Sequence, residues 1–272
     1  MADTSDYRPR ALVTGASSGI GRAFAERLAR DGHDLILVAR DRERLEKLAT
    51  RLKYEHGANV EVLVVDLSKP ADLRRLESRI AAEEALDVLI NNAGFGGYMP
   101  FVKLDPDKAE ELITVQVLAV TRLTRAALPG MIARNKGIII NVSSRFAFSG
   151  PVSGDRLPKR ATYAGTKAFI NTFTQLLASE LQGTGVRVQA LCPAVVRTEF
   201  HLRMGMDPNR FPAEIVSTPE DVVQASLAGL ELGEVICLPG MEDPALLSRL
   251  EEEQRKMFEG SGAGTIASRY KA

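Results

Sequence analysis

The sequence predicts an α/β protein built on a doubly wound parallel sheet of about seven strands, with helices on both faces. Short apolar runs alternate with longer segments of helical periodicity along most of the 272 residues. The short runs are apolar at consecutive positions, as expected for strands that are buried on both faces. Strands that alternate with helices in this way are joined by right-handed βαβ crossovers. The expected strands are Ala11–Thr14, Leu35–Ala39, Val60–Val65, Val88–Ile90, Gly137–Val142, Val186–Leu191 and Val235–Leu238.

The longer segments between these strands predict helices that cover the sheet. The expected helices are Gly19–Asp31, Arg42–Glu55, Ala71–Glu83, Pro106–Ala133, Ala161–Leu181 and Thr218–Glu231. Two connections interrupt the alternation, at about 145–161 and 199–217. The first is rich in Gly, Pro and charge, and the second contains Phe and Met side chains. Because such sheets bind ligands beyond the carboxyl ends of their strands, both connections are predicted to be substrate loops.

Length and composition favour one soluble domain over residues 1–272, with a C-terminal tail at about 251–272. Basic and acidic residues balance at 35 each, so the net charge favours neither nucleic acid nor a membrane surface as a partner. Cys192 and Cys237 lie in apolar runs without metal-type or redox-type spacing, and we expect buried thiols and no metal site. The first ten residues lack an apolar signal core, and no apolar run reaches the roughly 18 residues of a membrane span. We therefore expect a cytoplasmic protein.

A glycine-rich turn follows the first strand and leads directly into the first helix. It reads Thr14-Gly15-Ala16-Ser17-Ser18-Gly19-Ile20-Gly21, in the strand–turn–helix context that a dinucleotide fingerprint requires. Gly15 permits the tight turn, Gly19 lets the backbone approach a pyrophosphate, and Gly21 allows close helix packing. The helix N-terminus adds free N–H groups and partial positive charge for phosphates. The turn therefore predicts a Rossmann-type NAD(P) site, with a purely structural turn as the alternative.

The end of the second strand is the position that selects between the two nicotinamide cofactors. An acidic residue there would accept the adenosine ribose hydroxyls and favour NAD. The chain has Ala39 and Arg40 instead, with Asp41 and Arg42 following, and a guanidinium suits a 2′-phosphate. We expect NADP(H) to be preferred over NAD(H). The alternative is that Arg40 only ends the strand at the surface.

Tyr163 and Lys167 lie four residues apart in an expected helix, and therefore on the same face. A free Tyr has a pKa of roughly 10, too high for proton transfer near neutrality. A neighbouring cation stabilises the phenolate and lowers that pKa. The pair is expected to perform acid–base chemistry, although the same spacing also occurs on solvated helices.

From about Arg10 to Leu238 the chain resembles the short-chain dehydrogenase/reductase family, of the classical type. The resemblance rests on five motifs in the family's order, which are Thr14-Gly15-x3-Gly19-x-Gly21, Asp66, Asn91-Asn92-Ala93-Gly94, the set Ser144, Tyr163 and Lys167, and Cys192-Pro193-Ala194-x-Val196-x-Thr198. It implies an NADP(H)-dependent oxidoreductase that interconverts a carbonyl and an alcohol. It also implies a small-molecule substrate and a homodimer or homotetramer.

The resemblance assigns roles to individual residues. Tyr163 would give a proton to the carbonyl oxygen as hydride arrives, and Lys167 would lower its pKa and bind the nicotinamide ribose. Ser144, rather than Ser143, would hold the substrate oxygen. Further implied roles are adenine binding for Asp66, support of the central strand and adenine pocket for Asn91, space for the cofactor at Gly94, and anchoring of the carboxamide for Thr198. The implied cofactor contacts also include Ser17, Ser18, Ile20, Leu67, Asn92, Ala93, Pro193 and Val196.

Three features depart from the family pattern. Gln116 falls where the family usually has an Asn that bends the helix and holds a water in a proton relay. It is expected either to keep that relay with shifted geometry or to face outward on an ordinary helix. Ser144 lies 19 positions before Tyr163, a longer spacing than usual, so Pro151–Arg160 is expected to form a charged flap or a simple surface insertion. Ala194 replaces a common glycine, and its methyl group would crowd the site if φ were positive there.

The reacting groups implied by the resemblance are all present, and they favour a working enzyme. The alternative is a nucleotide-binding regulatory or scaffold protein on the same fold, because a fold does not fix a function. The identity of the substrate does not follow from these motifs.

Overall fold

The computed structural model describes residues 8–152, 154, 157–207, 211–262 and 264–271. Within them, seven parallel strands form one sheet in the order β3-β2-β1-β4-β5-β6-β9. The strands are β1 (Arg10–Thr14), β2 (Asp34–Ala39), β3 (Val60–Val64), β4 (Leu86–Asn91), β5 (Gly137–Val142), β6 (Val186–Leu191) and β9 (Ile236–Cys237). The chain runs outward from β1 to β3 and then crosses over to β4, so β1 and β4 flank the switch point at which such sheets bind ligands. The predicted doubly wound sheet is confirmed.

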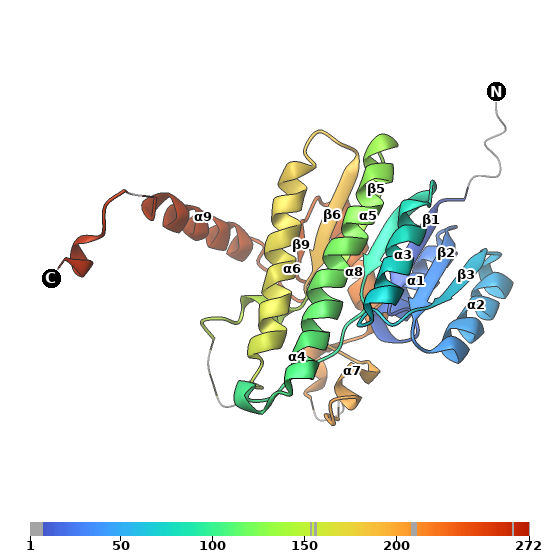
Figure 1. Ribbon diagram of the computed structural model, residues 1–272, viewed down its shortest axis with the longest axis horizontal. Helices are drawn as coiled ribbons and strands as arrows, with labels where there is room; N and C mark the ends of the chain where they lie inside the picture. Colours follow the sequence, from blue (N-terminus) through green and yellow to red (C-terminus); the bar gives the residue numbers. More distant parts are fainter. Residues whose placement is uncertain (1–7, 153, 155–156, 208–210, 263, 272) are drawn as a thin grey trace. The chain divides into compact units, whose positions relative to one another are not determined.

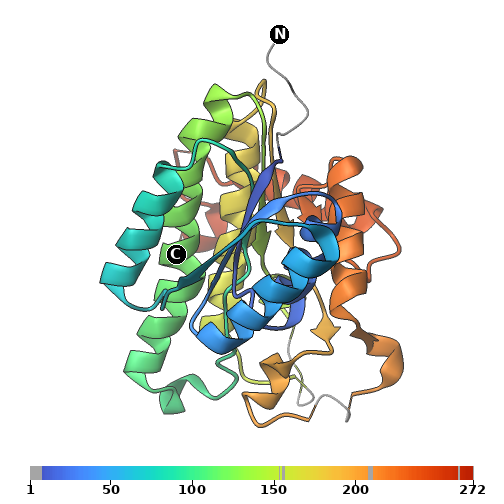
Figure 2. The ribbon, with the colours of Figure 1, turned by 90° about the vertical axis from the view of Figure 1, so that its right-hand side faces the viewer.

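Helices cover both faces of the sheet, as predicted. They are α1 (Gly19–Arg30), α2 (Arg42–His56), α3 (Pro70–Ala81), α4 (Pro106–Ile113), α5 (Ala119–Ala133), α6 (Ala161–Glu180) and α8 (Pro219–Glu231). Successive residues of β1 point to opposite faces, so that Val13 packs in one apolar core with α1, α2 and α8, while Leu12 packs in a second core with α3, α5 and α6. Figures 1 and 2 show α8 on the opposite side of the sheet from α3 and α5.

The helix expected over 106–133 is interrupted by a π-helical turn. The turn spans Thr114–Leu118 and joins α4 to α5 without a break in the chain direction. A π turn holds one residue more than an α turn, which shifts the side chains before it relative to those after it. Gln116 lies at its centre and is 1% exposed. The prediction of one uninterrupted α-helix was wrong at this turn.

The connections after β5 and β6 contain short ordered elements. The first includes a 3-10 turn, Arg145–Phe148, and the second includes α7 (Glu199–Leu202) and a 3-10 turn, Ala213–Ile215. A two-stranded parallel sheet pairs β7 (Val195–Val196) with β8 (Val216–Ser217) and so closes the second connection at its base. A further 3-10 turn, Phe101–Lys103, lies between β4 and α4.

The chain divides into one unit over Met1–Pro239 and a second over Gly240–Ala272. The second unit contains α9 (Ala245–Gly260), which has no buried residues, and a 3-10 turn at Ser268–Tyr270. The sequence placed a tail at about 251–272, whereas the separate unit begins at Gly240. None of the described helices is long and apolar enough to cross a membrane.

Candidate active site

A cavity of about 540 Å³ lies at the carboxyl ends of the parallel strands. It is lined by every residue predicted for catalysis or cofactor binding except Gln116. The predicted residues in its lining are Gly15, Ser17, Ser18, Gly19, Ile20, Arg40, Asp66, Leu67, Asn92, Ala93, Gly94, Ser144, Tyr163, Lys167, Pro193, Val196 and Thr198. Residues that are 183 positions apart in the sequence, such as Gly15 and Thr198, therefore share one site.

The glycine-rich turn requires its glycines for packing as well as for conformation. Gly15 has a φ of 68°, and a Cβ atom there would lie 2.7 Å from Nδ2 of Asn92. A Cβ atom on Gly21 would lie 2.4 Å from the carbonyl oxygen of Gly15. Asn92 donates to the carbonyl oxygen of Thr14 at 2.9 Å, while the Thr14 hydroxyl accepts from the backbone of Asn92 at 2.9 Å. These bonds fix the turn after β1 against the end of β4.

The N-terminus of α1 opens into this cavity. Ser18 is the N-cap residue, yet its side chain makes no capping hydrogen bond, which leaves the first N–H groups of the helix without a side-chain acceptor. Together with the helix dipole, these groups form an anion site. The close-packed glycines and the helix terminus fit a nucleotide diphosphate, as the sequence predicted.

The adenosine end of the cavity contains Arg40 and Asp66. The Arg40 guanidinium lies 3.7 Å from the Glu111 carboxylate, and its side chain is 63% exposed, so it is available to an incoming anion. Partial burial raises the pKa of Asp66, but hydrogen bonds from Ser68 and the charge of Arg40 outweigh it and bring that pKa below its usual value. Asp66 is therefore ionised at neutral pH and can accept a hydrogen bond from a ligand.

Asn91 does not line the cavity. Its side chain donates to Thr124 of α5 at 3.1 Å and to Asn141 of β5 at 2.9 Å. The structure thus agrees with the expected support of the central strand, while the expected support of the adenine pocket stays a prediction. The neighbouring Asn92 faces the cavity instead.

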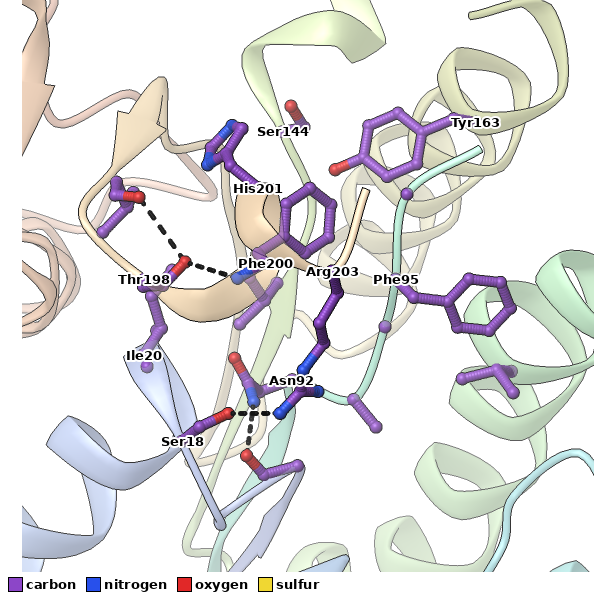
Figure 3. A pocket seen from close by; sticks show the side chains of 18 of the residues that line it. Ser18, Ile20, Asn92, Phe95, Ser144, Tyr163, Thr198, Phe200, His201 and Arg203 are labelled. Carbon is purple, nitrogen blue, oxygen red and sulfur yellow. Dashed lines mark hydrogen bonds between the residues drawn. The ribbon is translucent and has the colours of Figure 1, made fainter. Parts of the chain in front are cut away.

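Tyr163 is buried at the inner end of the cavity, where the neighbouring hydroxyl groups of Ser144 and Tyr98 act to lower its pKa. Figure 3 shows the Ser144 and Tyr163 hydroxyls pointing into the same region. Ser143, in contrast, donates to the backbone carbonyl of Lys167 at 3.0 Å. The choice of the second serine as the partner of Tyr163 agrees with this geometry.

Burial controls the ionisation of both Tyr163 and Lys167. It raises the pKa of Tyr163 to about 12, against the lowering effect of hydrogen bonds from Ser144 and Tyr98. It lowers the pKa of Lys167 to about 7. The Lys167 ammonium lies 5.6 Å from the centre of the Tyr163 ring and donates to the carbonyl of Val142 at 2.8 Å. The shared helical face is as predicted, and burial is the largest influence on both pKa values. The lowering of the Tyr163 pKa by Lys167 stays a prediction.

Gln116 lies behind the cavity rather than in its lining. Its Nε2 atom donates to the carbonyl of Phe95 at 2.6 Å, and its Oε1 atom accepts from the Thr166 hydroxyl at 3.0 Å. The alternative of an outward-facing side chain was therefore wrong. Ala194 is the other departure near the cofactor site. Its φ is not positive, because Asn135 is the only described non-glycine residue with a positive φ, and its methyl group therefore causes no backbone strain.

An aromatic wall surrounds Tyr163, and two of its members, Tyr98 and Phe146, were missed from the sequence. The ring centres of Tyr98, Phe200 and Phe146 lie 5.1, 6.1 and 6.4 Å from that of Tyr163. These rings come from the β4 exit, α7 and the turn after β5, so no local pattern joins them. The only available signal was an aromatic residue close to the carboxyl end of a parallel strand.

The helix α7 connects the substrate side of the cavity to the nucleotide side. Thr198 caps it by accepting from the backbone of Phe200 at 3.3 Å. Glu199 pairs with Arg44 at 2.7 Å and with Arg203 at 3.0 Å. Arg203 extends to Ser18 of the glycine-rich turn, with 3.5 Å between Nη2 and Oγ (Figure 3). Arg203 was also missed from the sequence.

Comparisons with known proteins agree with this site. The family model described as short chain dehydrogenase matches residues 9–207. A short-chain dehydrogenase from Sphingobium yanoikuyae, solved in complex with NADPH, is 39% identical with a TM-score of 0.90, and the match covers 96% of this chain and 99% of that one. A bulky-bulky ketone specific alcohol dehydrogenase from Comamonas testosteroni is 33% identical with a TM-score of 0.86, with 96% and 98% covered. The very-long-chain 3-oxoacyl-CoA reductase of Anas platyrhynchos is 33% identical over 236 residues, which are 84% of this chain and 72% of that protein. The chain therefore belongs to the short-chain dehydrogenase/reductase family and is an NAD(P)-dependent oxidoreductase.

Proposed function

We propose that this enzyme interconverts a ketone and a secondary alcohol with NADP(H) as its preferred cofactor. The observation that carries the proposal is the placement of Ser144, Tyr163 and Lys167 in the lining of the same cavity as the glycine-rich turn and Arg40. Bound NADPH would supply the hydride to the carbonyl carbon. The protein supplies hydrogen bonds, orientation and a site that is sheltered from water.

The two hydroxyl groups have distinct roles in this proposal. Ser144 donates a hydrogen bond to the carbonyl oxygen and holds it beside Tyr163. Tyr163 then transfers its proton to the oxygen as negative charge develops there, and in alcohol oxidation its phenolate takes the proton back. A pKa of about 12 keeps Tyr163 protonated near neutrality, which suits the acid role in reduction.

The residues around the nucleotide support NADP(H) over NAD(H). Arg40 presents an exposed guanidinium in the cavity lining, while Arg42 pairs with Glu46 at 3.2 Å. The Sphingobium relative was solved with NADPH. We propose that the 2′-phosphate binds Arg40, that the diphosphate binds the first turn of α1, and that Thr198 contacts the nicotinamide end.

The aromatic wall supports a bulky, largely apolar ketone as the substrate. Tyr98, Phe146 and Phe200 present ring edges and faces around the reacting hydroxyl. The Comamonas relative is a bulky-bulky ketone specific alcohol dehydrogenase. The reductase relatives that act on 3-oxoacyl-CoA make a 3-oxoacyl thioester the second candidate.

The proposed function is tested by following NADPH and NADH absorbance over a panel of diaryl ketones, bulky alkyl ketones and 3-oxoacyl thioesters. We expect turnover that favours NADPH and bulky ketones. Tyr163→Phe should abolish turnover and leave the dissociation constant of NADPH nearly unchanged. Tight NADPH binding without turnover of any ketone or thioester would instead support the nucleotide-binding regulatory or scaffold alternative. Retained turnover in Tyr163→Phe would remove that residue from the acid role.

A homodimer or homotetramer also remains our proposal for the assembly. Phe169 and Leu176 on α6 are 38% and 62% exposed in the single chain, and apolar side chains of this size on one helix are typical of a subunit contact. Light scattering measures the mass directly. A monomer at micromolar concentration would contradict the proposal.

A further inference from the structure

Arg203 follows α7 as its C-cap residue and lines the cavity from the substrate side. Its side chain extends toward the glycine-rich turn, where its Nη2 atom lies 3.5 Å from Oγ of Ser18 (Figure 3). The helix α7 begins against the same turn, because a Cβ atom on Gly19 would lie 2.9 Å from Cγ2 of Thr198, its N-cap residue. The connection after β6 therefore reaches the part of the cavity in which α1 begins.

The guanidinium of Arg203 lies beside a second positive group. Ser18 is the N-cap residue of α1, and its side chain makes no capping hydrogen bond, so the first N–H groups of that helix and their partial positive charge are near the guanidinium. Two positive groups at one place repel each other unless an anion lies between them. A guanidinium and a helix N-terminus that converge in a cavity therefore form an arrangement suited to an anion.

The carboxylate that pairs with Arg203 is shared with another arginine. Glu199 lies 3.0 Å from Arg203, while Nη1 of Arg44 on α2 lies 2.7 and 2.9 Å from the two Glu199 oxygens. The hydrogen bond from Arg44 is also the largest influence that lowers the pKa of Glu199. Glu199 therefore keeps a counter-ion when Arg203 turns to a ligand, and an exposed ion pair of this kind costs little to break.

Arg203 has hydrogen-bond donors to spare. Among the described residues, its contacts with Ser18 and Glu199 are both made by Nη2, which leaves Nη1 and Nε for a ligand. A guanidinium carries five N–H donors in a planar fork and binds phosphate oxygens in pairs. The side chain is 54% exposed, so it can turn without disturbing the core.

Arg203 is also distinguished from the other cations of the cavity lining by its place. Within the described part of the chain, those cations contact α4, β5 or the turn after β5 rather than the glycine-rich turn, and they are Arg40, Lys108, Arg145 and Lys167. Arg203 is thus the cation of the lining that is placed for an anion at the first turn of α1.

We propose that Arg203 binds the diphosphate of the nicotinamide cofactor from the side of α7. The inference rests on the proposed placement of the diphosphate at the first turn of α1. The guanidinium of Arg203 exchanges its shared carboxylate for the diphosphate, while Glu199 stays with Arg44. The diphosphate is then held between a helix N-terminus and a planar fork of donors. Cofactor affinity accordingly depends on the substrate loop as well as on the glycine-rich turn.

The variant Arg203→Leu removes the guanidinium from an exposed side chain. We expect the dissociation constants of NADPH and NADH to rise alike, by about 10-fold to 100-fold, because both cofactors carry the same diphosphate. Adenosine 2′-monophosphate has no diphosphate and should bind the variant and the wild type equally. Arg203→Lys should lose an intermediate amount of affinity, since it keeps the charge without the fork. Calorimetric titration measures these constants without turnover.

Two control variants separate ligand binding from a structural role of the ion pair. Glu199→Gln breaks the pair on α7 and leaves the guanidinium in place, so the affinity for NADPH should not fall. Arg27→Leu removes an arginine of α1 that pairs with Asp31 four residues away, at 2.7 Å, with the same spacing as Glu199 and Arg203. It should leave the dissociation constants of both cofactors unchanged.

Any of three results would overturn the inference. The first is an unchanged dissociation constant for NADPH in Arg203→Leu. The second is an equal loss in Glu199→Gln, since Arg203 would then act only by holding α7. The third is a loss for NADPH alone, which would place Arg203 at the 2′-phosphate. A protein that binds NADPH through Arg203 and reduces no ketone or thioester would contradict the proposed function and leave this inference standing.

Discussion

The side-chain oxygen of Gln116 accepts a hydrogen bond from the Thr166 hydroxyl at 3.0 Å and thereby joins the π-helical turn to α6, the helix that carries Tyr163 and Lys167. The amide nitrogen of the same side chain donates to the carbonyl of Phe95, in the segment after β4. One buried amide therefore holds together three segments around the active site. The extra residue of the π turn is what directs this longer side chain inward.

The first prediction concerns this amide. Gln116→Leu keeps the approximate volume but removes the partner of the Phe95 carbonyl, while Thr166 retains its bond to the Tyr163 carbonyl at 2.8 Å. We expect the free energy of unfolding to fall by about 1–3 kcal/mol, the cost of a buried polar group without a partner. Denaturant unfolding measures this directly. Thr121→Ala, which removes a hydroxyl bonded only to the carbonyl one turn before it, is the control, and an equal loss in the two variants would contradict the prediction.

The π-helical turn is an element that the sequence did not predict. The strand order and the glycine-rich turn could be predicted, because both depend on local patterns such as consecutive apolar residues and the spacing of Gly15, Gly19 and Gly21. A π turn adds one residue to a helix, and an apolar periodicity of 3.6 tolerates that without a visible break. The sequence therefore singled out Gln116 only because it falls at a position where the family usually has an Asn.

The ionisation of the Tyr163 and Lys167 pair could not be predicted for a different reason. Their spacing fixed the shared helical face correctly. The pKa values, however, depend on how deeply both groups are buried, and that burial is produced by β5, the β4 exit and α7 together. Tyr98 and Phe146 were missed for the same reason, because the segments that bring them to Tyr163 are distant in the sequence.

The second prediction tests cofactor selection. Arg40→Ala should weaken NADPH by about 10-fold to 100-fold, as expected when a charge-assisted hydrogen bond is lost, and should change NADH binding little. Arg42→Ala is the matched control, because Arg42 follows two positions later but pairs with Glu46. Calorimetric titration gives the dissociation constants. Equal weakening of NADPH and NADH by Arg40→Ala would refute a contact with the 2′-phosphate.

The third prediction concerns the long connection before α6. Arg160 donates to the Ser149 hydroxyl at 2.9 Å and to the Val152 carbonyl at 2.9 Å, and its guanidinium lies 5.1 Å from the centre of the Phe146 ring. One guanidinium therefore fastens this segment to the aromatic wall. Residues 153 and 155–156 of the predicted flap lie outside the described residues.

Arg160→Leu should raise KM for bulky ketones by about tenfold and leave kcat and the NADPH dissociation constant nearly unchanged, since one of several wall contacts is lost. Arg160→Lys should resemble Arg160→Leu more than the wild type, because an ammonium cannot reproduce the planar fork of donors. Steady-state kinetics separate the two constants. A fall in kcat with unchanged KM would place Arg160 in the reaction instead of the pocket wall.

The last prediction follows from the buried ammonium of Lys167. Its pKa in the folded chain is about 7, whereas an unfolded chain holds it near the ordinary value of about 10.4. Between these values the unfolded state binds more protons, so the free energy of unfolding rises with pH across this window and falls as pH drops through 7. Lys167→Met removes the titrating group and should flatten this slope in the cofactor-free protein, whereas Lys53→Met, at an exposed position on α2, should leave it intact. Denaturant unfolding at several pH values provides the slopes. An identical pH dependence in wild type and Lys167→Met would show that Lys167 stays charged in the folded state. Its charge would then be available to lower the Tyr163 pKa, as expected from the sequence.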